Sequence, residues 1–187
     1  MAVRKILLSG DKRLHRKAVK VKQFTPALKK LADDMLETVR HHQGVGLAGP
    51  QVGVMQRIFV AEIPASRGDG EEPHPQSGKS YILVNPELVS AASEMVEGKE
   101  GCLSIPNWFG RVERPAWVEL KARDVKGRKI KLKVDDLLAR IFMHELDHLN
   151  GILFTDHIRD PQKLWELLPE AEPEKEPAPA ASMEQAA

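Results

Sequence analysis

The run His144-Glu145-Leu146-Asp147-His148 combines two metal-ligating side chains with one that can move protons. Residues four apart lie on the same face of an α-helix, so both imidazoles can reach one ion. In the H-E-x-x-H pattern of metal-dependent hydrolases, the glutamate is a base that works on water and is not a ligand. The spacing therefore predicts a helical metal site with His144 and His148 as ligands and Glu145 as general base.

An alternative is a surface helix that carries two unrelated histidines. The sequence argues against it, because the histidines continue an apolar stripe formed by Leu137, Leu138 and Ile141. Side chains on that stripe face the core, where two imidazoles without a metal would be poorly satisfied.

A hydrolytic metal site usually has three protein ligands and one open position for water. One extended form of the pattern needs a histidine at position 154, which is Phe154, so that form is excluded. Glu166 could supply a distal carboxylate, but residues 160–168 resemble a peripheral helix. Cys102 is the better candidate for the third ligand, although a free cysteine is also commonly a small buried hydrophobic residue.

The composition fits one folded domain with a hydrophobic core, because the chain has 187 residues of which 42% are hydrophobic. A formal net charge of +1 gives no general reason to expect DNA or a membrane as partner. The single cysteine allows no intrachain disulfide, which suits a reducing compartment. No apolar run approaches the ~20 residues of a membrane span, and none near Met1 suits a secretory signal. We expect a soluble, cytoplasmic protein.

A helix is predicted to begin after Thr25, which suits the N-cap, with Pro26 at its first position and Gly44 at its end. Its apolar residues recur at helical spacing. They are Leu28, Leu31, Ala32, Met35, Leu36 and Val39.

The glycine-rich stretch 44–51 predicts a turn whose backbone approaches another group closely. A phosphate-binding loop is the rival interpretation. It is disfavoured because no Lys-Ser/Thr pair follows and the stretch leads into a strand, not a helix.

Most of the remaining elements are predicted to be strands, separated by a surface loop over residues 64–79. A buried strand is expected over 57–63, and two more over 81–84 and 87–91 are separated at Asn85-Pro86. The alternation of apolar and polar residues predicts a hairpin. Its strands are 117–123 and 129–134.

The helix that carries the histidines is predicted to begin after Asp135 and to end at Asn150-Gly151. A short final helix is predicted from Asp160, covering Leu164, Trp165 and Leu168. Residues 169–187 are rich in Pro, Ala and Glu, and we expect this tail to be disordered.

Three stretches together resemble a known family. Gly44–Gln51, Glu100–Pro106 and His144–Gly151 are similar, in order and spacing, to the three signatures of peptide deformylases. One position departs from the pattern, since Gly49 stands where the family usually has alanine. The resemblance implies an α+β domain over residues 1–168, in which antiparallel β-sheets pack around a central helix that carries the HExxH motif. It also implies hydrolytic removal of the formyl group from the N-terminal formyl-methionine of new polypeptides, with release of formate.

The resemblance assigns roles to further residues. It implies that Cys102 is the third metal ligand, and that the side-chain amide of Gln51 and the backbone N–H of Leu103 stabilise the oxyanion. It implies iron(II) as the cofactor in the cell, with zinc, nickel or cobalt as substitutes. A thiolate with two imidazoles equally suits zinc, so the ligand types leave the choice open.

A narrow apolar slot is needed for the methionine side chain of the formyl-methionyl substrate. We hypothesise that Val45, Gly46, Leu137 and Ile141 line it, since the last two flank His144 on one helix face.

Two further hypotheses concern charged residues. Asp147 points to a different helix face from the ligands, so we expect it to pair with Arg114 and tie the cysteine segment to the helix. Residues 1–30 carry ten lysines and arginines against one acid, Asp11. A transient contact with ribosomal RNA is therefore hypothesised. The residues concerned are Arg4, Lys5, Lys12, Arg13, Arg16 and Lys17.

Two rival functions use the same residues. One is an endopeptidase with the same three ligands. The other is a purely structural metal site, which would be closed by a fourth protein ligand from Asp147 or His157.

Overall fold

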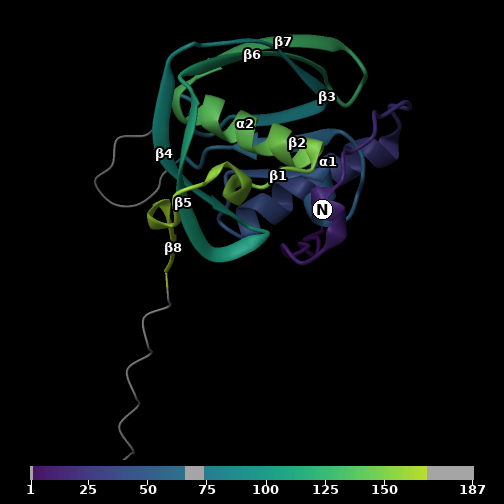
Figure 1. Ribbon diagram of the computed structural model, residues 1–187. Coiled ribbons are helices and arrows are strands. Elements are labelled where there is room, and N and C mark those ends of the chain that lie inside the picture. The colour runs from purple at the N-terminus through teal and green to yellow at the C-terminus, as the bar shows by residue number, and fades with distance from the viewer. Residues whose placement is uncertain (1, 66–73, 168–187) are drawn as a thin grey trace, which may run out of the picture.

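The computed structural model describes residues 2–65 and 74–167 of the chain. Two antiparallel sheets and two helices form this part, together with short 3-10 turns. Figure 1 shows α2 (Asp136–Asn150), the helix with the histidine pair, near the centre of the molecule. This arrangement confirms the predicted α+β class with antiparallel sheets. Neither helix of the described ranges is long and apolar enough to span a membrane.

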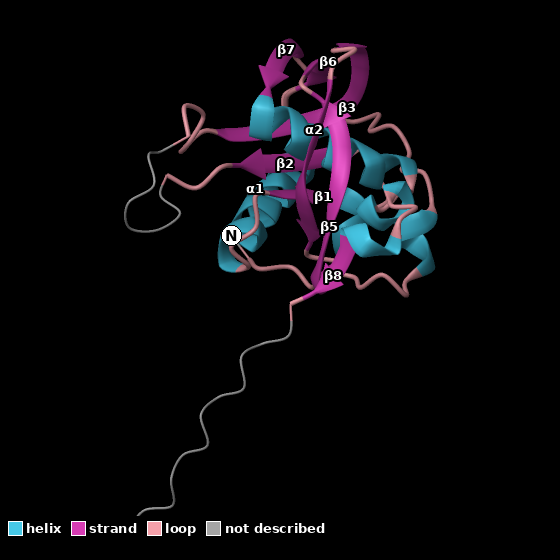
Figure 2. Ribbon diagram, turned by 60° about the vertical axis from the view of Figure 1, so that its left-hand side comes forward, coloured by secondary structure: helices cyan, strands magenta, loops and turns pink. Residues whose placement is uncertain are grey.

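The larger sheet has five strands in the order β1-β2-β3-β6-β7. They are β1 (Gly46–Ala48), β2 (Ile58–Glu62), β3 (Ser80–Ala91), β6 (Trp117–Arg123) and β7 (Lys129–Asp135). The smaller sheet has the order β4-β5-β8. Its strands are β4 (Met95–Cys102), β5 (Ile105–Pro115) and β8 (Leu164–Glu166). Figure 2 shows β8 at the opposite end of the molecule from β7.

Strand β2 is buried on both faces, which explains its continuous apolar sequence. Phe59 and Ala61 pack in one cluster with Phe142 of α2. Ile58 and Val60 point the other way and pack in a second cluster, with residues of α1 (Pro26–His41). Alternate residues of a strand face opposite sides, so this part of the sheet separates the two helices.

Helix α1 begins as predicted, with Thr25 at the N-cap and Pro26 in the first turn. Its predicted end at Gly44 is wrong. The helix ends at His41, and Gln43 takes the left-handed conformation with φ 53°. The N–H of Gly44 still bonds to the carbonyl oxygen of Val39 at 2.9 Å. Glycine is therefore not needed for the left-handed residue here.

Helix α2 has the predicted bounds, beginning after Asp135 and ending before Gly151, whose φ is +76°. A side chain at Gly151 would overlap the backbone of His15 and Arg16 in the N-terminal segment. This glycine thus serves both the turn and a close backbone approach.

The hairpin of β6 and β7 is confirmed, and their register runs from Trp117–Asp135 to Arg123–Lys129. The two strands predicted on either side of Asn85-Pro86 are one strand, β3. The predicted break is a β-bulge, where Asn85 has φ 52° and its side chain bonds to the backbone of Val21. A bulge lets the strand keep pairing with β6 beyond the irregular residues.

The short final helix is wrong. Pro161–Lys163 form a single 3-10 turn (η4), and Leu164–Glu166 are the strand β8, which pairs with β5. Ladder hydrogen bonds to β5 outweigh the helical spacing of so few apolar residues. Leu168, the tail 169–187 and residues 66–73 of the predicted loop lie outside the described ranges. The domain boundary at 168 stays a prediction.

Candidate metal centre

The two histidines of α2 lie one turn apart on its buried face, with ring centroids separated by 4.9 Å. Cys102 is the last residue of β4, and its Sγ lies 3.3 Å from Nε2 of His148. One ligand atom from each of Cys102, His144 and His148 lies within 4.8 Å of the other two. The structure thus brings together the three predicted metal ligands from segments about 40 residues apart in the sequence.

The ring of His144 is oriented by a carboxylate that the sequence did not single out. Nδ1 of His144 lies 2.9 Å from Oε2 of Glu100, which leaves Nε2 directed toward the group of ligand atoms. A carboxylate in this position fixes the ring and makes the other nitrogen a better ligand. Glu100 stands two residues before Cys102 in the same motif. An acidic residue this close to the candidate cysteine was the signal that the sequence offered.

The pKa values of the two histidines move in opposite directions. Burial opposes protonation of His144, but hydrogen bonds to Cys102 and Glu100 outweigh it and raise its pKa well above the usual value. Burial, together with the positive charges of His144 and Arg114, lowers the pKa of His148 well below the usual value. His148 therefore presents a neutral ring nitrogen, the form that binds metal ions.

Glu145 is buried beside the three ligands, with 3% of its surface exposed. Its Oε2 has no hydrogen-bond partner among the described residues. Burial raises the pKa of Glu145 to about 7, against the opposing charge of His144. The backbone of Gly46 lies against this carboxylate, and any side chain at position 46 would overlap it. This carboxyl can gain and lose a proton near neutral pH.

The predicted pairing of Arg114 with Asp147 is present. Nη1 of Arg114 donates to Oδ2 of Asp147 at 2.6 Å, and both residues are buried. Arg114 also holds Glu100 with two hydrogen bonds, at 2.9 and 3.0 Å. The cysteine strand is therefore tied to α2 through Glu100, whereas the hypothesis had named no partner on that strand.

A closed, four-ligand site finds no support in this geometry. Oδ2 of Asp147 also lies 2.7 Å from Nε2 of His157. Both candidate fourth ligands thus contact each other and Arg114, and neither belongs to the group of potential ligand atoms in the described residues. Three protein ligands would leave a bound ion one open position for a small molecule.

Gln51 lies in the 3-10 turn η2 (Gly49–Val52) and is 1% exposed. Its Oε1 accepts a hydrogen bond from the N–H of Ala48 at 2.8 Å, which fixes the orientation of the amide. Its Nε2 is then directed to Sγ of Cys102 at 3.4 Å and Oγ of Ser104 at 3.2 Å. A hydrogen-bond donor thus stands at the edge of the ligand group.

A pocket of about 730 Å³ opens onto Cys102, His144 and Glu145. All of the residues predicted to bind substrate line it: Val45, Gly46, Leu137 and Ile141. Gln51 and Leu103 line it as well, as do residues that the sequence did not indicate. These are chiefly Lys99, Trp108, Phe109 and Arg140.

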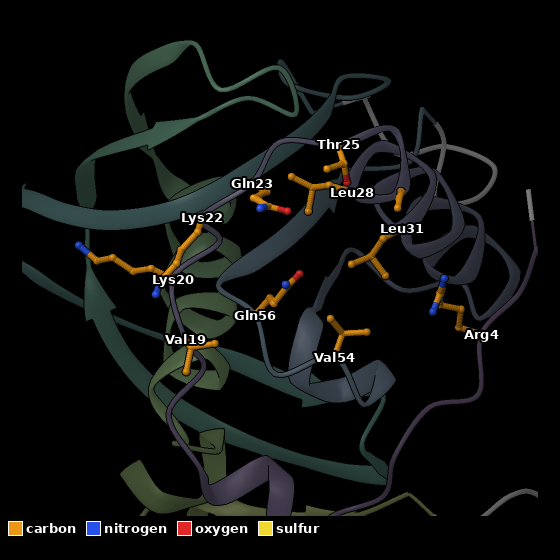
Figure 3. Close-up of a pocket in the computed structure, with 11 residues that line it drawn as sticks. Arg4, Val19, Lys20, Lys22, Gln23, Thr25, Leu28, Leu31, Val54 and Gln56 are labelled. Carbon is orange, nitrogen blue, oxygen red and sulfur yellow. The ribbon is translucent and has the colours of Figure 1, made fainter.

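A second hollow, of about 870 Å³, lies away from this group between α1 and the chain that precedes it. Figure 3 shows Lys20 and Lys22 on one side of it and Arg4 on the other, with Leu28 and Leu31 between them. Its lining contains no cysteine, histidine or carboxylate, so it is not the candidate metal centre.

The donor set fits a transition metal. One sulfur and two imidazole nitrogens converge in a buried place, and such soft and borderline donors favour zinc, iron and related ions over magnesium or calcium. Oε2 of the adjacent Glu145 lacks a hydrogen-bond partner among the described residues. Water held beside a bound ion would give this buried oxygen a partner.

Comparison with known proteins gives a consistent answer. The family model of polypeptide deformylases matches residues 3–164. The peptide deformylase of Thermomicrobium roseum is 46% identical over 86% of this chain and 88% of that protein. That of a Roseiflexus species is 43% identical, over 86% and 91%.

Solved structures of peptide deformylases also match this chain. The crystal structure of peptide deformylase from Ehrlichia chaffeensis matches with a TM-score of 0.78 and 37% identity, over 87% of this chain and 91% of that one. The enzyme from Thermotoga maritima matches with a TM-score of 0.75 and 35% identity, over 86% and 100%. The chain therefore belongs to the polypeptide deformylase family, hydrolases that remove the N-terminal formyl group from new polypeptides.

Proposed function

We propose that Cys102, His144 and His148 hold one divalent metal ion, and that this site releases formate from the formyl-methionine of new polypeptides. The observation that carries the proposal is the convergence of one thiol and two imidazoles next to a buried carboxylate, where Cys102, His144 and Glu145 line a pocket. Iron(II) is the proposed ion in the cell, and zinc, nickel or cobalt could replace it because the same donors bind each of them.

The chain's own residues would divide the work as follows. The bound metal would supply Lewis acidity toward water and the formyl oxygen. Glu145 would accept a proton from the attacking water at its carboxylate and pass it to the leaving amine. Its raised pKa, about 7, suits both steps near neutral pH. The products balance as formate and a free N-terminal amine.

Two donors would stabilise the oxyanion that forms when water adds to the formyl carbon. One is Nε2 of Gln51, which is already held in place by the bond of Oε1 to Ala48. The other is the backbone N–H of Leu103, in the turn between β4 and β5. Donors fixed in advance cost no reorganisation during the reaction.

The first prediction concerns the base. Glu145→Gln should lower the rate of formate release from a formyl-Met peptide by roughly 10²–10⁴-fold, because the amide cannot carry the proton. Its metal content should equal that of the wild type, since Glu145 is not a ligand. Stopped assays with metal analysis of the same sample measure both.

A matched control is Glu119→Gln, which removes a surface carboxylate that pairs with Lys131. It should leave the rate unchanged. Wild-type protein that cleaves an internal peptide bond but releases no formate would instead support the endopeptidase.

The second prediction concerns the orientation of His144. Glu100→Gln should weaken metal binding by about 10–100-fold, because the ring loses its ionised partner. A competition titration against a chelator measures the affinity. The control is Glu97→Gln on the same strand, whose carboxylate pairs with Lys163 at the surface. Equal affinities for the two variants would contradict the role of Glu100.

The third prediction concerns the methionine slot, which we propose is lined by Val45, Gly46, Leu137 and Ile141. Ile141 is 4% exposed and lies one helical turn before Glu145. Ile141→Arg should raise KM for formyl-Met peptides by tenfold or more, as roughly 1.5–3 kcal/mol of apolar contact is lost. Metal content should be retained. An unchanged KM would remove Ile141 from the slot.

The fourth prediction concerns the ribosome and the cytoplasm, where we propose that the enzyme acts. Of the six basic residues, Arg4 and Arg13 form ion pairs with Asp34 and Asp11. The other four are exposed: Lys5, Lys12, Arg16 and Lys17. Contact with RNA phosphates should weaken steeply between about 50 and 200 mM salt. Cosedimentation with ribosomes that ignores salt would contradict this contact.

A further inference from the structure

The N-terminal segment, residues 2–19, runs past all three motif stretches. Ala2 and Arg4 donate backbone hydrogen bonds to Asp34 and Thr38 of α1, at 3.0 and 2.9 Å. Further along, the N–H of Ala18 bonds to the carbonyl oxygen of Leu149 near the end of α2, at 2.9 Å. The segment is thus anchored at both ends, on elements that belong to the core.

Between these anchors the segment makes two backbone bonds to the site. The N–H of Leu7 donates to the carbonyl oxygen of Gln51 at 2.8 Å. The N–H of Ser9 donates to the carbonyl oxygen of Ser104 at 2.9 Å. Gln51 and Ser104 also contact each other, through Nε2 and Oγ at 3.2 Å. These three hydrogen bonds, together with the chain from Leu7 to Ser9, form a closed ring next to Cys102.

We propose that Leu7 and Ser9 are positioning residues, which set the separation of the two oxyanion donors through their backbone N–H groups. This inference rests on the proposed function of Gln51 and Leu103. Two residues of chain span at most about 7 Å, so the two carbonyl groups cannot separate while both bonds persist.

The turn that carries the Leu103 donor is short and needs outside support. It consists of Leu103 and Ser104 alone, because Cys102 ends β4 and pairs directly with Ile105 of β5. The register shifts between Gly101 and Cys102, so regular ladder pairing does not fix the turn. The hydrogen bond from the N–H of Ser9 holds the carbonyl of Ser104, the second residue of this turn, next to Leu103, whose N–H is the proposed donor.

The position of Ser9 offers a specific test. Asp11 N–H bonds to Leu8 O at 2.8 Å, so Ser9 is the second residue of a β-turn, and its φ is not positive. Proline favours this place in a turn. Ser9→Pro should keep the turn, remove the N–H and force the Ser104 carbonyl away from the ring carbon that replaces the hydrogen.

The fifth prediction is that Ser9→Pro lowers kcat for a formyl-Met peptide on the order of tenfold, with KM and metal content near those of the wild type. Displaced donors stabilise the transition state less, while the substrate still fits the pocket. Amide exchange, followed by mass spectrometry, should become faster in the stretch 101–105.

The control is Val125→Pro. Val125 is also the second residue of a turn, closed by the bond of Gly127 N–H to Asp124 O at 3.0 Å, and its own N–H donates to no partner in the described ranges. It should leave kcat and the exchange of 101–105 unchanged. A folded, metal-loaded Ser9→Pro enzyme with wild-type kcat would overturn the proposal.

If Ser9→Pro fails to fold, a measurement on the metal-loaded wild type tests the positioning role of Leu7 and Ser9. Amide exchange by NMR should show Leu7 and Ser9 exchanging at a rate close to that of the 101–105 stretch, because one opening frees them all. Clearly different rates would overturn the proposal. Wild-type protein that releases no formate would instead refute the proposed function, while the exchange rates would still test the positioning.

Discussion

The geometry of the candidate metal centre depends on the contacts of one buried carboxylate, that of Glu100. Its side chain is 3% exposed, and it accepts hydrogen bonds from Arg114 and Arg140 while contacting Nδ1 of His144. Taking such an ion out of water costs several kcal/mol unless it is fully paired. Burial acts to raise the pKa of Glu100, but the bonds from His144 and Arg114 outweigh it and hold that pKa well below the usual value. Because Glu100 lies on β4 and its partners lie on β5 and α2, this one group fixes the cysteine strand relative to the histidine helix.

The contacts of Arg140 explain why strand β4 contains a glycine, Gly98. Its Nη2 donates to the carbonyl oxygen of Val96 at 2.7 Å, and its Nη1 donates to that of Val112 at 2.7 Å. A side chain at Gly98 would overlap the guanidinium, so glycine makes room for it in the strand. Gly98 and Glu100 are therefore the residues of β4 that let α2 approach the strand.

How much of this could be predicted follows from the distances in sequence. The relation of His144 to His148 depends only on the helical repeat, so the pattern predicted it, as it predicted the buried face of α2 and the hairpin of β6 and β7. Cys102 joins them across about 40 residues. The sequence offered it as the better candidate for the third ligand, and the resemblance to a family implied that role. No local pattern encodes an ion pair between Glu100 and Arg140 or the pairing of β8 with β5. The prediction of a final helix from Asp160 was wrong because Leu164–Glu166 pair with the edge of β5, a strand far away in the sequence.

For the glycine-rich stretch 44–51, the sequence predicted a close approach of the backbone but not the group that it approaches. In the structure Gly46 clears the carboxylate of Glu145, and Gly44, two residues earlier, has Leu103 Cδ1 only 3.0 Å from where a Cβ would lie. A side chain at Gly49 would overlap two carbonyl oxygens of the turn that follows, those of Val54 and Gln56, both 2.7 Å from where a Cβ would lie. Glycine therefore lets the turn pack closely against this position.

Of these glycines, Gly46 makes room for the buried carboxylate of Glu145. Burial raises the pKa of Glu145, and the bare backbone at Gly46 lets the chain lie close against the carboxylate. A larger residue at Gly46 would have to push the carboxylate away from the ligands or open the site to solvent. The raised pKa of Glu145 therefore depends on a residue without a side chain at position 46.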